Sequence, residues 1–128
     1  MKNMKKLLIV GLLSGTGSLQ LHRTGVVKFV LSRPVGERAL CGLLQNVAGG
    51  GTLYEVPARG NFSARIELQA QGKTRRSAVY RYAMLIASSS LPTVQVRIAH
   101  LVIQYIDGGA VDVGLYRRRI REIRKEKI

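Results

Sequence analysis

Apolar residues along much of this chain alternate with polar ones, in short runs separated by turn-forming residues. The clearest alternation covers residues 61–70. Its apolar positions are Phe62, Ala64, Ile66 and Leu68, and the polar positions between them are Ser63, Arg65, Glu67 and Gln69. A period of two is typical of an antiparallel strand with one buried and one exposed face. We therefore expect a half-buried strand here.

Turn signals divide the rest of the chain into further extended segments. The segments 6–13 and 18–23 flank a glycine- and serine-rich turn, which predicts an N-terminal hairpin over about residues 6–23. Further strands are predicted over residues 26–31, 52–56, 77–86 and 93–106. Residues 36–47 fit either a short helix or an irregular excursion. About six or seven consecutive strands with short turns favour an antiparallel meander, with the sheet over about residues 52–106.

The pattern changes to a helical period near the C-terminus. Tyr116, Ile120 and Ile123 fall at positions i, i+4 and i+7, and Asp112 suits an N-cap, so a helix is predicted over about residues 112–127. Arginine and lysine fill its remaining face. One sheet and one helix make an α+β domain whose apolar sheet surface is incompletely covered. We therefore expect a dimer or a larger assembly.

The first residues also fit a second interpretation. Basic residues precede the apolar run 7–13, as in a signal peptide, but the run is short and no clear cleavage site follows. We favour a first strand, and a secreted or envelope protein is the alternative. No segment approaches the roughly 20 apolar residues of a membrane span, so no membrane partner is expected.

Charge is the most unusual property of the composition. The 128 residues include 21 Lys and Arg against 7 Asp and Glu, a net charge of +14. A polyanionic partner would relieve the resulting self-repulsion, which favours nucleic acid over an anionic membrane surface. The single cysteine, Cys41, lies in an apolar run and fits a buried small hydrophobe better than a nucleophile.

Candidate catalytic chemistry is sparse. No glycine-flanked serine, phosphate-binding loop or zinc-binding histidine pair with its glutamate occurs. His100 falls on the apolar side of the strand predicted at 93–106, and His22 lies beside a turn. The chain is therefore predicted not to be an enzyme, and no cofactor or metal ion is expected.

One face of the predicted sheet gathers polar and basic residues suited to RNA. The candidate RNA-binding residues are Arg65, Gln69, Arg76, Tyr80, Tyr82, Gln95 and Arg97. Exposed tyrosines stack on unpaired bases, which favours RNA loops over duplex DNA. The register of residues 77–86 is open: a slip of one position would replace the two tyrosines by Val79, Arg81 and Ala83.

Over roughly residues 60–120, the chain resembles the coat proteins of single-stranded RNA bacteriophages. Residues 63–74 look like the family's strand, polar turn and return strand. Leu91 and Pro92 precede the segment 94–102, which looks like its long sheet strand. Leu115 and Tyr116 then fall where the family's C-terminal helical region begins.

This resemblance implies a fold, an assembly and a function. The implied fold is an N-terminal β-hairpin, an antiparallel sheet and a C-terminal helix, intertwined with a second copy as a homodimer. Such dimers form an icosahedral capsid that packages single-stranded RNA against its inner sheet face, and several members bind an RNA hairpin as translational repressors. The implied location is the virion, assembled in the bacterial host cytoplasm. The alternative function is a non-assembling basic RNA-binding protein, ribosomal or RNA-chaperone-like.

Overall fold

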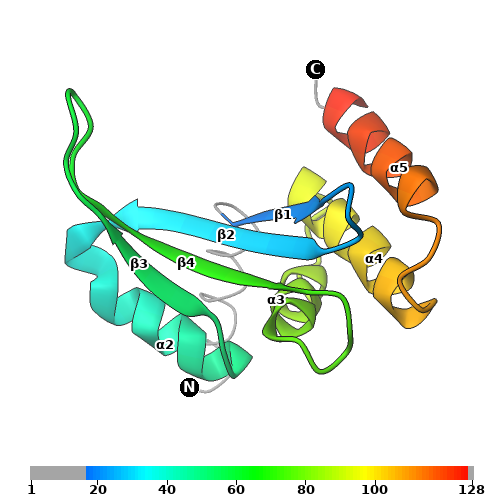
Figure 1. Ribbon diagram of the computed structural model, residues 1–128, viewed down its shortest axis with the longest axis horizontal. Helices are drawn as coiled ribbons and strands as arrows, with labels where there is room; N and C mark the ends of the chain where they lie inside the picture. The colour runs from blue at the N-terminus through cyan, green and yellow to red at the C-terminus, as the bar shows by residue number, and fades with distance from the viewer. Residues whose placement is uncertain (1–16, 127–128) are drawn as a thin grey trace.

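The structure, a computed structural model, describes residues 17–126 (Figure 1). Within these residues the strands are β1 (Ser18–Leu21), β2 (Val27–Pro34), β3 (Thr52–Val56) and β4 (Arg65–Gly72). The helices are α2 (Arg38–Ala48), α3 (Ala78–Ala87), α4 (Val94–Asp107) and α5 (Val113–Glu126), with a 3-10 turn η1 (Val35–Glu37) before α2.

The strands form one antiparallel sheet in the order β1-β2-β4-β3. β2 and β4 pair along their whole lengths, from Val27 opposite Gly72 to Pro34 opposite Arg65. η1 and α2 separate β2 from β3 in the sequence, and β3 does not pair with β2. β3 forms an edge of the sheet, and β4 lies between β2 and β3. The predicted meander order is therefore wrong.

One face of the sheet is buried against the helices. Its buried side chains are Leu19, Leu21, Val27, Phe29, Leu31, Ile66, Leu68 and Ala70. The ring of Phe29 stacks on that of Tyr82 from α3, with ring centroids 4.4 Å apart. Burying a phenylalanine contributes about 1.5–3 kcal/mol, so this stack helps to fix the sheet on α3. Figure 1 shows α2 beside β3 and β4, while α3 and α4 lie at the other end of the sheet.

Several sequence-based predictions are confirmed. A strand spans Thr52–Val56, and the alternation predicted within residues 61–70 holds from Arg65 onward in β4. The first of the two alternatives for residues 36–47, a short helix, matches α2. In α5, Ile120 and Ile123 are buried as the helical period predicts.

The strands predicted at residues 77–86 and 93–106 are wrong, because these segments form α3 and α4. The buried residues of α3 are Val79, Tyr82, Ala83 and Ile86. They follow the spacing i, i+3, i+4 and i+7 of a helix. β-branched and aromatic residues favour a strand only when they pack within a sheet. Here they lie along one side of a helix that packs against the buried face of the sheet. The predicted sheet over residues 52–106 is therefore not formed.

The coat-like architecture is contradicted as well. That prediction placed the chain in an intertwined dimer, because one helix could not cover the expected sheet. Instead, α2, α3 and α4 from the same chain bury the apolar sheet face. The physical reason for expecting a second copy over that face is therefore removed.

The predicted N-terminal hairpin lies partly outside the described residues. Its first segment, residues 6–13, falls there, as do the signal-peptide and first-strand interpretations. The second segment contains β1, which pairs with β2 across a turn closed by the hydrogen bond from His22 N to Val26 O, 2.9 Å. None of the described helices has the length and apolar character needed to cross a lipid bilayer.

Candidate nucleic-acid interface

The face of the sheet opposite the core is predominantly polar. Residues paired in register share a face, so the positions alternating with the buried ones define this surface. We call it the open face; it comprises Ser18 and Gln20 (β1), Lys28, Val30 and Ser32 (β2), Thr52, Tyr54 and Val56 (β3), and Arg65, Glu67, Gln69 and Gln71 (β4). Its rows run across the strands, for example Ser18, Val30, Gln69 and Thr52. Four strands thus present hydrogen-bonding side chains side by side.

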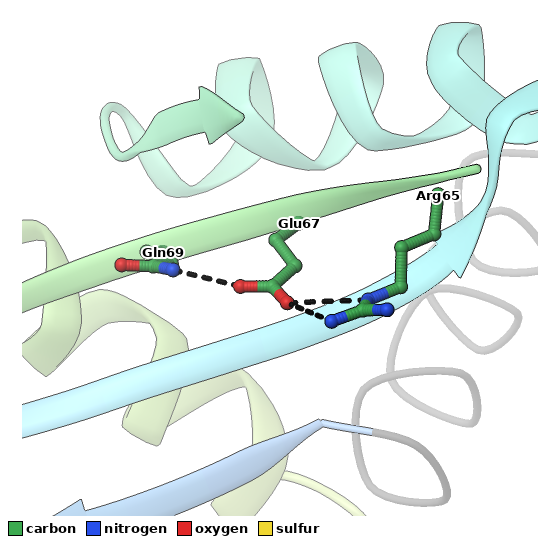
Figure 2. A network of polar contacts seen from close by, with 3 residues as sticks. All are labelled: Arg65, Glu67 and Gln69. Carbon is green, nitrogen blue, oxygen red and sulfur yellow. Dashed lines mark hydrogen bonds and ion pairs between the residues drawn. The ribbon is translucent and has the colours of Figure 1, made fainter. Parts of the chain in front are cut away.

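Three open-face side chains of β4 form a polar network (Figure 2). Nε and Nη2 of Arg65 donate to Oε2 of Glu67 at 3.3 and 3.2 Å. Nε2 of Gln69 donates to Oε1 of Glu67 at 2.8 Å. The carboxylate would oppose a polyanionic ligand, and the Arg65 guanidinium offsets its charge. The network also holds the three side chains in one orientation along the strand.

Basic residues surround the open face at its ends. Arg23 lies in the turn between β1 and β2, and Arg59 lies in the loop between β3 and β4. Lys73, Arg75 and Arg76 follow β4 in the loop before α3, where all three are exposed. These cations therefore lie at the ends of the strands that carry the open face.

One of these rim arginines is held by an acidic partner on α4. Nε of Arg75 donates to Oδ1 of Asp107 at 2.7 Å, and the Tyr80 hydroxyl donates to the same oxygen at 2.9 Å. Both hydrogen bonds hold the pKa of the Asp107 carboxyl below its usual range. Arg75 is thus tied to the helical layer.

A cleft lined by arginine runs between β1 and α5. Its volume is about 440 Å³. Its lining residues are Gln20, Leu21, His22, Arg23, Arg117, Ile120, Arg121 and Arg124. Arg117 donates to the Leu21 carbonyl at 3.2 Å and Arg124 donates to the Leu19 carbonyl at 2.8 Å. These two arginines therefore cover the edge of β1, and the cleft places further arginines between Gln20 of the open face and α5.

The structure separates the residues predicted to bind RNA. Arg65 and Gln69 lie together on the open face, and Arg76 lies in the loop after β4. Arg97 lies on α4, where it pairs with Glu126 at 2.7 Å. Gln95, also on α4, accepts from the Leu19 backbone N–H at 3.1 Å.

The two candidate tyrosines belong to α3 rather than to a strand. Tyr82 is fully buried, and its hydroxyl donates to the Gly50 carbonyl at 2.9 Å. Burial raises the pKa of Tyr82 to about 12. Tyr80 is half-buried and is bonded to Asp107. Neither ring lies on the open face, because a helix replaces the expected strand.

Sequence reasoning missed several open-face residues. Gln20, Lys28, Thr52 and Tyr54 lie on this surface beside Gln69 and Gln71. Lys28 alternates with the apolar residues Val27 and Phe29, so the period of β2 carried the signal. What was missing was the strand order, which places β2 beside β4.

Two further residues considered in the sequence analysis, Cys41 and His100, lie on helices. Cys41 is buried on α2, as predicted for a small hydrophobe, and burial raises the pKa of its thiol. His100, expected on an apolar strand face, is exposed on α4, so that prediction is wrong. Within residues 17–126, no group of three or more His, Cys, Asp or Glu side chains could hold a metal ion.

Comparison with known proteins finds a similar fold. No family model and no curated protein matches the chain. The homing endonuclease I-CvuI, solved in complex with its target in the presence of calcium, gives a TM-score of 0.67 at 14% identity, over 94% of this chain and 82% of that one. The homing endonuclease I-TnaI gives 0.61 at 14% identity, over 94% and 96% of the two chains. At these identities the similarity shows a shared fold.

A second I-CvuI structure agrees with the first. It holds the I-CreI target in the presence of magnesium, with the DNA not cleaved. Its TM-score is 0.56 at 14% identity, over 97% of this chain and 94% of that one. Both I-CvuI structures are thus complexes with a target.

These similarities overturn the functional predictions. The neighbours are homing endonucleases and not RNA phage coat proteins, so the predicted capsid, shell and packaged single-stranded RNA are contradicted. The alternative of a non-assembling RNA-binding protein is not supported either. The prediction that the chain is not an enzyme is contradicted, since its structural neighbours are homing endonucleases. Two helices predicted as strands caused the false resemblance.

Proposed function

We propose that this chain binds double-stranded DNA, with the open face of its sheet against the major groove. The observation that carries the proposal is the open face itself, a polar surface on four strands in a fold whose neighbour I-CvuI is solved with a DNA target. Within residues 17–126, no cluster of three or more His, Cys, Asp or Glu side chains could hold a metal ion. The open-face residues support duplex binding.

The dimensions of the sheet suit this groove. β2 and β4 each have eight residues, which at about 3.3 Å per residue span about 26 Å. That length corresponds to roughly seven or eight base pairs at about 3.4 Å each. The major groove is about 12 Å wide and admits a two-stranded ribbon, so the β2–β4 pair can enter it.

The side chains on the open face are suited to the edges of base pairs. Glutamine pairs with adenine, arginine and lysine pair with guanine, serine and threonine bond to either, and apolar groups contact the thymine methyl. The open face offers the first three kinds as Gln20, Gln69, Gln71, Lys28, Arg65, Ser32 and Thr52. Val30 lies among them and offers an apolar contact. This mixture provides for direct readout of sequence.

The basic rim provides the contacts that do not depend on sequence. Phosphate contacts position a protein on the duplex and make its affinity fall with salt. Arg23, Lys73 and Arg76 lie in loops at the ends of the central strands, and Arg121 lines the cleft beside β1. A duplex lying on the open face would place its backbones near these residues.

The test compares two arginines with similar exposure and the same kind of acidic partner. Arg65 is on the open face and Arg97 is on α4; each pairs with one glutamate, and their side chains are 40% and 43% exposed. Duplex affinity is measured by fluorescence anisotropy with a library of labelled duplexes at several salt concentrations. We expect Arg65→Ala to weaken binding by about 1–3 kcal/mol, while Arg97→Ala has little effect.

Two results would refute the proposal. One is that the unmodified chain binds no duplex at any salt concentration. The other is that Arg65→Ala and Arg97→Ala weaken binding equally, which would indicate attraction by overall charge and not by the open face. Circular dichroism of both variants checks that each remains folded, as expected for substitutions of partly exposed side chains.

A further inference from the structure

The loop between β3 and β4 ends in a tight hairpin that projects beyond the sheet (Figure 1). Arg59 N donates to Phe62 O at 3.0 Å, and Phe62 N donates to Arg59 O at 2.9 Å. These bonds enclose Gly60 and Asn61 as a two-residue turn. Gly60 has φ +58°, a value that favours glycine at this place. The tip therefore has a defined shape instead of being an open loop.

An aromatic ring is exposed at this tip. Phe62 is 72% exposed, more than any other exposed large apolar side chain in the described part of the chain. Alternation within residues 61–70 predicted it on the buried side of a strand, but β4 begins only at Arg65, so Phe62 is free of the core. Such a ring would be more favourable out of water, which makes Phe62 a candidate contact residue.

The ring borders a hollow that continues the open face. Val56, Pro57, Arg59, Phe62 and Arg65 line this hollow, which has a volume of about 440 Å³ and which we call the tip hollow. Val56 and Arg65 are paired in register in the end row of the open face. The tip hollow thus lies where the proposed DNA-binding surface ends.

The chemistry of the tip hollow fits a nucleotide, which combines a planar base with an anionic phosphate. Its walls combine an aromatic ring, two small apolar residues and two guanidinium groups. No acidic side chain within residues 17–126 pairs with Arg59, whereas Arg65 pairs with Glu67. A nucleobase stacks on such a ring, and guanidinium groups bond to its edge or to its phosphate.

We propose that the tip hollow takes one nucleobase of the bound DNA, stacked on Phe62, at the outer end of the footprint. The inference rests on the proposed duplex binding and adds a subsite to it. Taking a base partly out of the helix costs free energy, and pyrimidine–purine steps are the easiest to unstack. The protein therefore prefers such a step at this position because the step unstacks easily, independently of any contact with the edges of its bases.

A tryptophan reporter tests the stack directly. The chain contains no tryptophan, so Phe62→Trp introduces one probe at the tip. Stacking on a base quenches tryptophan emission, and we expect most of the emission to be lost as duplex DNA saturates the protein. The matched control is Leu91→Trp, whose position is 59% exposed in the loop between α3 and α4 and should show little quenching.

Affinity measurements separate stacking from a simple apolar contact. Phe62→Ala should weaken duplex binding about tenfold, the loss expected for one base–aromatic stack. Phe62→Leu should weaken it as much, because leucine keeps apolar area but cannot stack, and Phe62→Trp should retain affinity. The melting temperatures should stay close to that of the unmodified chain, since the ring is outside the core.

The outcomes distinguish the two proposals. If the duplex binds, as followed by the anisotropy of labelled DNA, but Phe62→Trp is not quenched, the stacking subsite is wrong and duplex binding stands. Full affinity in Phe62→Leu would also overturn the subsite. If the unmodified chain binds no duplex, both proposals fail.

Discussion

Replacing Glu67 by Gln should strengthen duplex binding and make it more dependent on salt. Glu67 is the acidic residue among the described positions of the open face, and it accepts hydrogen bonds from Arg65 and Gln69 (Figure 2). Glutamine has almost the same shape, and its side-chain oxygen still accepts from Gln69. The substitution therefore removes the charge with little change in packing and frees the Arg65 guanidinium.

The size of the effect follows from the charges involved. A carboxylate about 7 Å from a phosphate is repelled by about 0.6 kcal/mol in water-like surroundings, or about threefold in Kd, and salt screens part of this. If the freed Arg65 neutralises one further phosphate, the slope of log K against log salt becomes steeper by about 0.9. Between 50 and 200 mM salt, this reduces the advantage of the variant by about 3.5-fold.

The cost in stability should be small. The side chains of Arg65 and Glu67 are 40% and 19% exposed, and partly exposed ion pairs contribute at most about 1 kcal/mol. The melting temperature of Glu67→Gln should therefore fall by no more than about 5 °C. A change in DNA affinity can then be attributed to the binding surface.

The assay has a matched control on the neighbouring strand. Glu55 on β3 pairs with Arg38 at 3.2 Å, with both side chains 63% exposed, and it faces away from the open face. Glu55→Gln also removes one negative charge and frees one arginine. Anisotropy titrations from 50 to 200 mM salt should show a steeper slope for Glu67→Gln and an unchanged slope for Glu55→Gln.

Two outcomes would refute this reasoning. Weaker binding by Glu67→Gln would mean that the carboxylate orients Arg65 for a required contact, so that the network aids binding. Identical Kd values and slopes for Glu67→Gln and Glu55→Gln would mean that DNA does not lie on the open face.

Three further substitutions test the framework behind this surface. Tyr105→Phe removes the hydroxyl that donates to the Gly25 carbonyl at 2.6 Å, and urea unfolding should show a loss of about 1–3 kcal/mol; an unchanged stability would contradict the buried hydrogen bond. Asp107 has a lowered pKa because Arg75 and Tyr80 donate to it. Its contribution to the free energy of unfolding is therefore present above about pH 4 and is lost as pH falls further. Thermal unfolding of Asp107→Asn should therefore change less with acid than that of the unmodified chain, and an equal change would contradict the pairing. Burial raises the pKa of Tyr82 to about 12, so its contribution is complete below about pH 10 and is lost as pH rises toward 12. Tyr82→Phe should flatten that alkaline decline, and an equal decline in both proteins would place its origin elsewhere.

Sequence alone predicted the part of the sheet whose pattern is unambiguous. From Arg65 onward, β4 alternates between core and open face as its period of two requires. The strand Thr52–Val56 was bounded by glycine on one side and proline on the other. These features depend on neighbours within a few residues, so no knowledge of tertiary structure was needed.

The parts that failed depend on contacts distant in sequence. Tyr82 is a helical core residue because Phe29, from a strand more than fifty positions earlier, receives its ring. Lys28 became a candidate only when strand order placed β2 beside β4. Short apolar runs fit both the period of a strand and that of a helix. The neighbouring surface that decides between them forms only when the chain folds. The sequence therefore predicted which residues of β4 lie on the open face, but it did not predict that β1, β2 and β3 contribute to the same face.

The basic character of the chain serves the fold as well as the ligand. Arg117 and Arg124 donate to carbonyls on the outer edge of β1, which leaves that edge less available for pairing with another strand. Arg81 donates to the carbonyls of Ala48 and Gly49 at the end of α2. If all 14 net charges contacted phosphates, log K would fall with log salt with a slope of about −13. Because several arginines bind carbonyl oxygens of the protein itself, the measured slope should be clearly shallower, and the difference reflects the cations that the fold retains.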